Sequence, residues 1–440
     1  MQTVGGGRTG HKCFDVNGRF IRSVSNGING RQIYVDQYYD EAGRPERVSE
    51  HYFKSDPVYW NETALDKLGR VTAVLHAGGD DISRDFDERA GGGCSAAGPG
   101  VSVTTNALGQ RVTEVKNALG ETIESCDDYC GCLSFEYDST GNLTTVAAQD
   151  GSTTRMEYDG GGRKISLSDP DKGDWQYAYN PLGEMTRQLD SKQQAIDFEY
   201  DALGRITHRR ELKDVNSLDD TAVTVVNHEA TQYRNVSPGR SRAETVTYSE
   251  GEAGAIIHQK RMTYDGLGRV SGVSTTIAGH QFYQETSYDA HGRVFQQFDA
   301  SGDDHGLRYV YRNGYLGQLK EAREGVDGVA YQSVLDMDAR GNVTLAELGN
   351  CVSVFADYDP SSGHLVSLRA YDSLGVELQD VAYLFDVLGN LESRLDQSGE
   401  INMKETFSYD RLNRLRQVKL TAPEFGLGSP EETLALDYDE

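Results

Sequence analysis

A tyrosine–aspartate dipeptide recurs along the chain and constrains its fold more than any other feature. In full, the motif reads Tyr-Asp-x-x-Gly followed by Arg or Asn. Full copies begin at Tyr39, Tyr137, Tyr158, Tyr200, Tyr264 and Tyr288, and drifted copies begin at Phe14, Leu65, Tyr179, Met337 and Phe385. In the most regular block the first turn residues, Asp138, Asp159, Asn180 and Asp201, lie 21 positions apart. A fixed period of this length predicts a repeat architecture.

Each position of the motif suits a tight turn between two β-strands. Aspartate at the first turn position can accept hydrogen bonds from the backbone ahead of it, and glycine at the fourth accepts a positive φ. A type I turn followed by a left-handed glycine is a common hairpin loop with a β-bulge. The tyrosine ends the incoming strand with its ring expected in the core, and the Arg or Asn begins the return strand.

The residues flanking the turns alternate between apolar and polar, as at Trp175, Tyr177 and Tyr179. Strict alternation predicts strands with one buried and one wet face. A second turn, such as Asp150-Gly151-Ser152, closes each period. Because one hairpin is not stable alone in water, we expect the hairpins to pair into a single antiparallel, all-β sheet. A long sheet twists, which predicts a winding ribbon or hollow β-shell with little helix.

Charge and composition narrow the classes of function. The 440-residue chain has 43 basic and 69 acidic residues, a formal charge of −26. Its overall field therefore repels phosphate and argues against nucleic acid as a partner. No stretch approaches the roughly 20 apolar residues that a membrane-spanning helix needs. The first residues show no apolar core of a secretory signal, so export would use another route.

The repeat divides the chain into four segments. Residues 1–100 carry drifted repeats and end in a glycine-rich, linker-like stretch, and residues 101–212 form the regular array. Residues 213–262 are polar and irregular, which predicts an insertion, and residues 263–440 resume the array with variable spacing. Neither end shows the capping unit that repeat arrays need, so we expect a segment of a larger polypeptide with an incomplete C-terminal array.

These units resemble those of the Rhs/YD-repeat family, which includes bacterial Rhs polymorphic toxins, the B and C components of Tc insecticidal toxins, and teneurin-like shells. They cover nearly the whole chain, most weakly over 1–100 and 213–262. The resemblance implies a hollow β-shell that encloses a toxin domain in toxin members, and a partner toxin-complex subunit. It also implies secretion or display on the cell surface. The self-cleavage segment of many members has no match here, so no residue is assigned that role.

One dense cysteine cluster, Cys126-x3-Cys130-x-Cys132, is a weak candidate for a metal site. Three thiolates could bind zinc or another soft ion with a fourth ligand from elsewhere, such as Cys94. Alternatively, Cys126 and Cys130 could form a local disulfide, or all three could be free thiols in a turn. We therefore predict no metal site and no cofactor, and keep these three cysteines as the weak candidates.

Other possible sites have simpler structural explanations. The run from Gly5 to Lys12 lacks the lysine position and the helix of a phosphate loop. The aspartates between Asp299 and Asp304 lack the spacing of a calcium loop. No Ser–His–Asp set or carboxylate pair separates from the many turn aspartates, so the chain is predicted not to be an enzyme.

The sequence thus predicts a structural role. Our first hypothesis is a non-catalytic segment of a β-shell that encapsulates a toxin or other cargo. The alternative is an extracellular carbohydrate-binding or adhesion surface, because rows of tyrosine and tryptophan that face outward could stack on sugar rings of cell-surface glycans.

Overall fold

The structure is a computed structural model that describes residues 9–86, 100–127, 131–220, 224–237, 240–252, 254–301, 306–323, 326–399, 402–421 and 432–436. These residues form strands and turns and contain no helix. It follows that the described chain has no helix able to cross a membrane. The linker-like stretch predicted before residue 100 lies almost wholly outside the described residues.

Within the described residues, 36 strands follow one another with short connections. The first half comprises β1 (Gly10–Phe14), β2 (Phe20–Asn26), β3 (Gln32–Tyr39), β4 (Pro45–Ser49), β5 (Tyr52–Phe53), β6 (Trp60–Leu65), β7 (Val71–Leu75), β8 (Ile82–Phe86), β9 (Val101–Asn106), β10 (Arg111–Lys116), β11 (Thr122–Cys126), β12 (Cys132–Tyr137), β13 (Leu143–Ala148), β14 (Thr153–Tyr158), β15 (Lys164–Asp169), β16 (Gly173–Tyr179), β17 (Met185–Leu189) and β18 (Ala195–Tyr200). The second half comprises β19 (Ile206–Lys213), β20 (Thr224–Ser237), β21 (Arg240–Glu250), β22 (Ile256–Tyr264), β23 (Val270–Ile277), β24 (His280–Tyr288), β25 (Val294–Phe298), β26 (Gly306–Arg312), β27 (Tyr315–Arg323), β28 (Val326–Met337), β29 (Val343–Leu348), β30 (Ser353–Tyr358), β31 (Leu365–Tyr371), β32 (Glu377–Phe385), β33 (Leu391–Asp396), β34 (Met403–Tyr409), β35 (Leu415–Thr421) and β36 (Glu432–Ala435).

The strands form one continuous antiparallel sheet. From β6 onward, each strand pairs with the next one along the chain, up to β35 with β36. The order is interrupted once, where β3 pairs with both β4 and β5, and β4 pairs onward with β6. The strands run across a long ribbon, so hairpin turns line its two edges. We call the edge that carries the motif turns the YD edge, and the other the opposite edge.

The predicted turn geometry is present in every regular repeat. In the turn after Tyr158, the N–H of Gly162 donates to the carbonyl of Asp159, and Gly162 has a φ of 76°. The strand register shifts between Glu157 and Tyr158, which is the expected bulge. The sequence prediction of hairpins joined by bulged type I turns is therefore confirmed.

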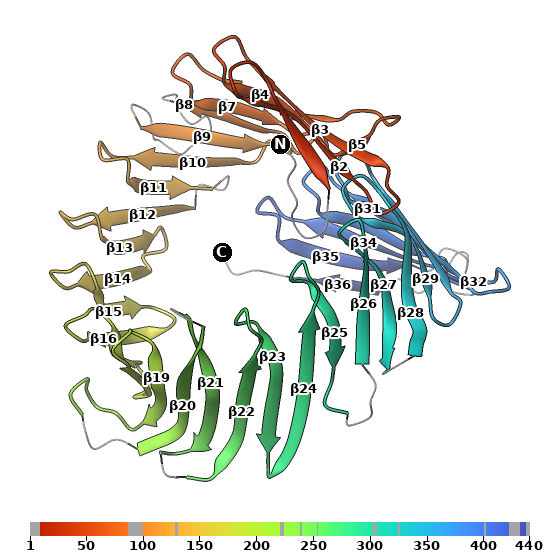
Figure 1. Cartoon of the computed structure of the whole chain (residues 1–440). Helices are drawn as coiled ribbons and strands as arrows, with labels where there is room; N and C mark the ends of the chain where they lie inside the picture. The colour runs from red at the N-terminus through yellow and green to blue at the C-terminus, as the bar shows by residue number, and fades with distance from the viewer. Residues whose placement is uncertain are drawn as a thin grey trace.

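The ribbon curls until its two ends meet (Figure 1). The path runs from β1–β9 through β10–β19 and β20–β25 to β26–β36, where the late strands lie beside the early ones. Within the described residues, no backbone ladder joins β1 to β36. The sheet therefore winds through a turn without closing into a hydrogen-bonded barrel, as predicted for a winding ribbon.

Burial in this single-layer sheet is shallow. Strands such as β14 alternate between half-buried and exposed residues, and the motif tyrosines are half-buried. The expectation of a fully buried face and a tyrosine core is met only in part, because no second layer covers the sheet. Buried apolar residues gather in three small clusters instead, two of them where the ends of the ribbon meet.

Residues 213–262, for which the sequence predicts an irregular insertion, add long strands to the same sheet. Strand β20 pairs with both β19 and β21, and β21 pairs with β22. The connection before β20 folds back so that Val215, with none of its surface exposed, packs on Leu189 and Leu212. This stretch lacks the motif turn, but it continues the ribbon.

Candidate functional site

Distant parts of the described chain meet where the opposite edge of the early hairpins contacts the YD edge of the late ones. We call this contact the seam, formed by residues 27–31, 50–53, 76–80 and 106–110 against residues 313–315, 336–340, 359–364, 386–390 and 410–413. Residues hydrogen-bonded across it lie between 285 and 307 positions apart. The seam fixes the curvature of the whole ribbon and is the candidate functional site.

The seam begins with an apolar plug. Ile28, at the turn between β2 and β3, is 1% exposed and packs on Tyr315, Val334 and Met337. The side-chain amide of Asn313 donates to the carbonyls of Gly27 and Ile28 at 3.1 and 3.2 Å. The Gly27 carbonyl also accepts the N–H of Gly30, so Asn313 adds a second bond there and gives the buried Ile28 carbonyl a partner.

Beside the plug lies a shared carboxylate. Asp336 accepts hydrogen bonds from Asn29 and Arg31, each at 2.7 Å. Burial raises the pKa of Asp336, but the Asn29 hydrogen bond, the Met337 backbone N–H and the Arg31 charge outweigh it, so the net pKa lies below the usual value. The Arg31 guanidinium also lies 3.9 Å from the centre of the Phe53 ring, which packs with Ile33 and Ala339.

Arg340 joins three segments at the centre of the seam. Its Nη1 is 3.0 Å from Glu50 Oε2, and its Nη2 donates to the carbonyls of Pro360 and Ser361. Asn61 holds the other oxygen of Glu50 at 2.6 Å. A single guanidinium thus connects the β4–β6 turn of the early hairpins to two late YD turns.

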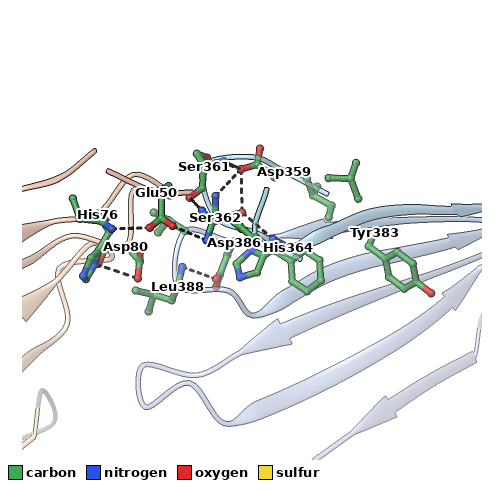
Figure 2. A pocket seen from close by; sticks show the side chains of 17 residues that line it. Glu50, His76, Asp80, Asp359, Ser361, Ser362, His364, Tyr383, Asp386 and Leu388 are labelled. Atoms are coloured by element: carbon green, nitrogen blue, oxygen red, sulfur yellow. Dashed lines mark hydrogen bonds and ion pairs between the residues drawn. The ribbon is translucent and has the colours of Figure 1, made fainter. Parts of the chain in front are cut away.

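A cavity of about 490 Å³ opens beside this pair. In Figure 2, Glu50, His76 and Asp80 approach it from the early hairpins, and Ser361, His364 and Asp386 approach from the late ones. Its apolar wall includes Val366, Phe385 and Leu388. A second cavity of about 830 Å³ follows along the same seam, between Leu108 and Phe407. Both cavities are gaps left where two rows of turns meet.

The serines and the histidine of the first cavity cap a turn and do not form a catalytic set. The hydroxyls of Ser361 and Ser362 both donate to Asp359 Oδ1, and the His364 ring packs 4.7 Å from Phe385. Burial raises the pKa of Asp359, but the serine hydroxyls and N–H groups more than offset it, so its net pKa is lowered. This is the chemistry of a turn that starts with aspartate.

The rest of the seam depends on close backbone approach and amide pairing. A Cβ added to Gly78 would lie 3.0 Å from the Cβ of Ser362, so a larger residue would require Ser362 to move by a few tenths of an ångström. Gln110 and Asn413 exchange two side-chain hydrogen bonds at 3.0 and 3.2 Å. None of these seam residues stands out in the sequence, because no local pattern records a contact about 300 residues away.

The cysteines singled out in the sequence lie elsewhere. The structure joins Cys126 to Cys132, not to Cys130, because the β11–β12 register places these two residues opposite each other. Cys130 and Cys94 lie outside the described residues, and Cys13 and Cys351 are free. Of the other rejected sites, Asp299 accepts the N–H of Ser301 as a turn residue, and the N-terminal glycines lie outside the described residues.

Comparison with known proteins supports the assignment of the motif as a repeat of a known family. A family model described as RHS Repeat matches residues 137–174, the most regular part of the array. No curated protein matches the chain. Among solved structures, TcdB2–TccC3–Cdc42 superposes with a TM-score of 0.77 at 16% identity, over 98% of this chain and 25% of that chain. A Photorhabdus luminescens Tc holotoxin pore gives 0.75 at 14% identity, over 97% of this chain and 26% of that chain.

The chain has the fold of the Tc toxin structures and carries an RHS repeat. The predicted resemblance to the Rhs/YD-repeat family and the predicted all-β fold of antiparallel hairpins are confirmed. This chain spans about a quarter of the length of the Tc structures that it matches. The likeness concerns the fold of that matched quarter.

Proposed function

We propose that this chain is a non-catalytic wall segment of a hollow β-shell that encloses a toxin or other cargo. The seam is the observation that carries the proposal. It brings one edge of the ribbon into contact with the other after nearly a full turn. Successive turns of a ribbon joined in this way form a continuous wall. A binding module or an enzyme would not need such a long, repetitive contact between edges.

The part of the YD edge that lies outside the seam supports further stacking. Five leucines at the turn tips are between 65% and 84% exposed: Leu68, Leu119, Leu182, Leu203 and Leu267. Leu388 occupies the same motif position within the seam, where it is half-buried. A periodic row of exposed leucines is typical of a contact surface. We infer that another turn of similar sheet covers this row, from the same shell or from a partner toxin-complex subunit.

Secretion or surface display follows from this role, since a toxin shell acts outside the cell that makes it.

The titratable groups of the seam support a role without catalysis. Glu50 and Arg340 neutralise each other, and Asp359 is occupied by its own turn. No group in this cavity is poised as a nucleophile beside a base.

The test is to isolate the native protein with whatever chains it carries and to image it by cryo-electron microscopy. We expect a closed cage whose wall contains this sheet and whose interior holds extra density. Limited proteolysis should leave that interior material intact until the cage is denatured. An open ribbon with both faces accessible to protease would contradict the proposal.

A second candidate function is carbohydrate binding, favoured by an aromatic platform on β3–β6. Tyr34 stacks on Tyr52, and Tyr38 meets Trp60 with ring centres 5.3 Å apart. Arg47 lies 4.7 Å from the centres of both the Tyr38 and Trp60 rings. Partly exposed aromatic rings beside polar groups are suited to stacking on sugars.

A panel of immobilised glycans tests this second candidate. Saturable binding that is abolished in both Tyr38→Ala and Trp60→Ala would support it. Tyr283→Ala is the matched control, because Tyr283 is 50% exposed on β24, outside the platform. Binding that is absent from the panel, or that is equally reduced in the control, would count against a glycan-binding platform.

A further inference from the structure

Strands β11 and β12 carry a group of ligand atoms that the proposed wall function does not use. Cys126 and Cys132 face each other across the two strands and form a disulfide, with Cα atoms 4.1 Å apart. Cys126 is 1% exposed, so its sulfur is shielded from water. The neighbouring strand β10 places Thr113, itself buried, directly opposite Cys126.

Glu124 completes the group from the same face of β11, two residues before Cys126. Its Oε1 lies 3.2 Å from Cys126 Sγ. One oxygen of Glu124 and the two sulfurs all lie within 4.8 Å of one another.

The contact between Glu124 and Cys126 is poorly matched in the disulfide state. A disulfide sulfur has no proton to donate, so the carboxylate oxygen gains no hydrogen bond from it. A thiol would supply a proton to that oxygen, and a cation between the sulfur and the oxygen would bind both. The position of Glu124 is therefore better satisfied when the disulfide is open.

We propose that Glu124, Cys126 and Cys132 bind one soft divalent cation, such as Zn²⁺, when the disulfide is reduced. A thiol reductant supplies two electrons and two protons, breaks the S–S bond and is itself oxidised to a disulfide. Zn²⁺ then displaces two protons from the thiols and forms two bonds to sulfur and one to the Glu124 oxygen. Water takes the fourth position of the tetrahedron.

The donor set and its surroundings suit this ion. Thiolates select soft ions such as zinc over calcium and magnesium, and a carboxylate is an accepted zinc ligand. Two thiolates and one carboxylate attract a divalent cation, and because Glu124 and Cys132 are only half-buried, the residual negative charge keeps contact with water. The paired strands hold all three residues in place, so little ordering is needed on binding.

The two states close the same turn by different chemistry. In an oxidising compartment the disulfide links β11 to β12, and in a reducing one the cation does so. The two strands are therefore cross-linked before and after any transfer between such compartments.

The test uses the full chain with Cys130→Ser, which removes the nearby thiol that the proposal does not need. The protein is reduced with a water-soluble phosphine and titrated with Co²⁺, then with Zn²⁺ against a chromogenic chelator. We expect one ion per chain, with the thiolate charge-transfer and d–d absorption bands of tetrahedral cobalt. The same protein left oxidised should bind no cobalt.

Glu124→Gln separates this site from two isolated thiols. Loss of a ligand should weaken Zn²⁺ binding by at least about tenfold, given that even outer-sphere partners are worth that much. Cys13→Ser with Cys351→Ser is the control and should bind as the parent does. Unchanged affinity in Glu124→Gln, or loss of the cobalt bands through Cys130→Ser alone, would overturn the proposal. Circular dichroism of each variant confirms that the sheet is retained.

Discussion

At the scale of single residues, the motif connects each repeat to the next. Asp159 Oδ1 accepts the N–H groups of Gly161 and Arg163, and its Oδ2 accepts Arg163 Nε at 2.6 Å. These bonds, the side-chain bond from Arg163 first, lower the pKa of Asp159. The Arg163 guanidinium lies 5.2 Å from the ring centre of Tyr179 in the next repeat. The Tyr179 hydroxyl in turn donates to the carbonyl of Lys164 at 2.8 Å.

The same ladder recurs along the YD edge. Hydroxyls of the tyrosines or their equivalents donate to the carbonyl just after the previous turn in the pairs Tyr39–Phe20, Tyr137–Thr122, Tyr200–Met185, Tyr233–Ile206, Tyr288–Val270, Tyr311–Val294 and Tyr409–Leu391. Tyr264 donates instead to Ala243, the fourth residue of β21. The tyrosine is therefore a connector between repeats more than a core residue. Burial raises the pKa of several of them, including Tyr200 and Tyr409.

Removing one hydroxyl should measure this connection. Tyr179→Phe keeps the ring and deletes the bond to Lys164, and we expect it to lower the free energy of unfolding by about 1 kcal/mol. Tyr177→Phe is the matched control on the same strand, because the Tyr177 hydroxyl makes no hydrogen bond in the described residues. It should change stability by less than about 0.5 kcal/mol. Equal effects of the two variants in urea denaturation would argue against the ladder.

The side chains of the first and fifth turn residues are matched as hydrogen-bond acceptor and donor. Aspartate pairs with Arg163 or Asn142 at the fifth position, whereas Asn180 donates its amide to Glu184 at 2.5 Å. We expect Asn180→Asp to place two carboxylates together and Glu184→Arg to leave two donors facing each other. Each single change should lower the free energy of unfolding by about 0.5 kcal/mol. The double variant should recover this free energy by forming an Asp–Arg pair. Additive losses in thermal unfolding would contradict the pairing.

At this scale the sequence predicts the turn but not the partners of its side chains. The glycine and aspartate positions are sufficient to predict the bulged hairpin, because φ and local hydrogen bonding decide it. The match at the fifth position can also be read from the sequence, since Asp occurs with Arg or Asn, and Asn with Glu or Gln, apart from Asp372, which occurs with Val376. The tyrosine–carbonyl bond was not readable, because it requires knowing how neighbouring hairpins align.

At the scale of elements, the hairpin repeat is confirmed and its exceptions are informative. Around β3 the sheet branches, and Asp36, which is 6% exposed, accepts bonds from Arg22 and from the Tyr52 hydroxyl. The bond from Arg22, followed by that from Tyr52, lowers the pKa of Asp36. The alternation of apolar and polar residues in the sequence predicts the strands. It does not predict the buried Asp36 carboxylate or the length of strands β20 and β21.

Tyr52 should make the early hairpins sensitive to alkaline pH. Burial first, and then the Asp36 carboxylate, raise the pKa of Tyr52 to about 12 from a reference value of 10.0. The protonated Tyr52 hydroxyl thus contributes fully to the free energy of unfolding below pH 10. This contribution is lost as the pH rises toward about 12, because Tyr52 ionises at a higher pH in the folded state than in the unfolded state. We expect the loss to be about 1–2 kcal/mol after allowance for partial exposure.

Chemical denaturation over that pH range checks this prediction. Tyr52→Phe should flatten the alkaline loss relative to the wild-type chain. Tyr34→Phe should retain it, because it leaves Tyr52 and Asp36 together and removes only a hydroxyl that bonds to Gln32 at the surface. A wild-type slope in Tyr52→Phe would show that other groups cause the loss.

At the scale of the whole molecule, the seam decides whether the ribbon is a closed wall or an open strip. Its contacts combine an apolar plug at Ile28, the Asp336 carboxylate and the Glu50–Arg340 pair. The sequence predicts that a long sheet curls, but not where its edges meet. That position depends on twist accumulated over many strands, and it leaves no periodic trace in residues such as Asn313 or Arg340.

Gly78 tests the closeness of the seam. Gly78→Ala would press a methyl group against Ser362, and we expect a loss of about 1–3 kcal/mol from this overpacking. Hydrogen exchange should also rise in residues 359–364. Gly160→Ala is the matched control, since nothing lies within 4 Å of a Cβ at that position. If both variants behaved alike, the two edges would not be in contact at Gly78.

Small-angle X-ray scattering of the purified chain in solution tests the closure of the seam. A closed seam predicts a curled, ring-like particle: a compact distance distribution with a depleted centre, which matches scattering calculated from this structure. An elongated particle, with a distribution that tails to the length of an uncurled ribbon, would contradict it. In that case the seam would not hold, and the chain would not by itself form a turn of wall.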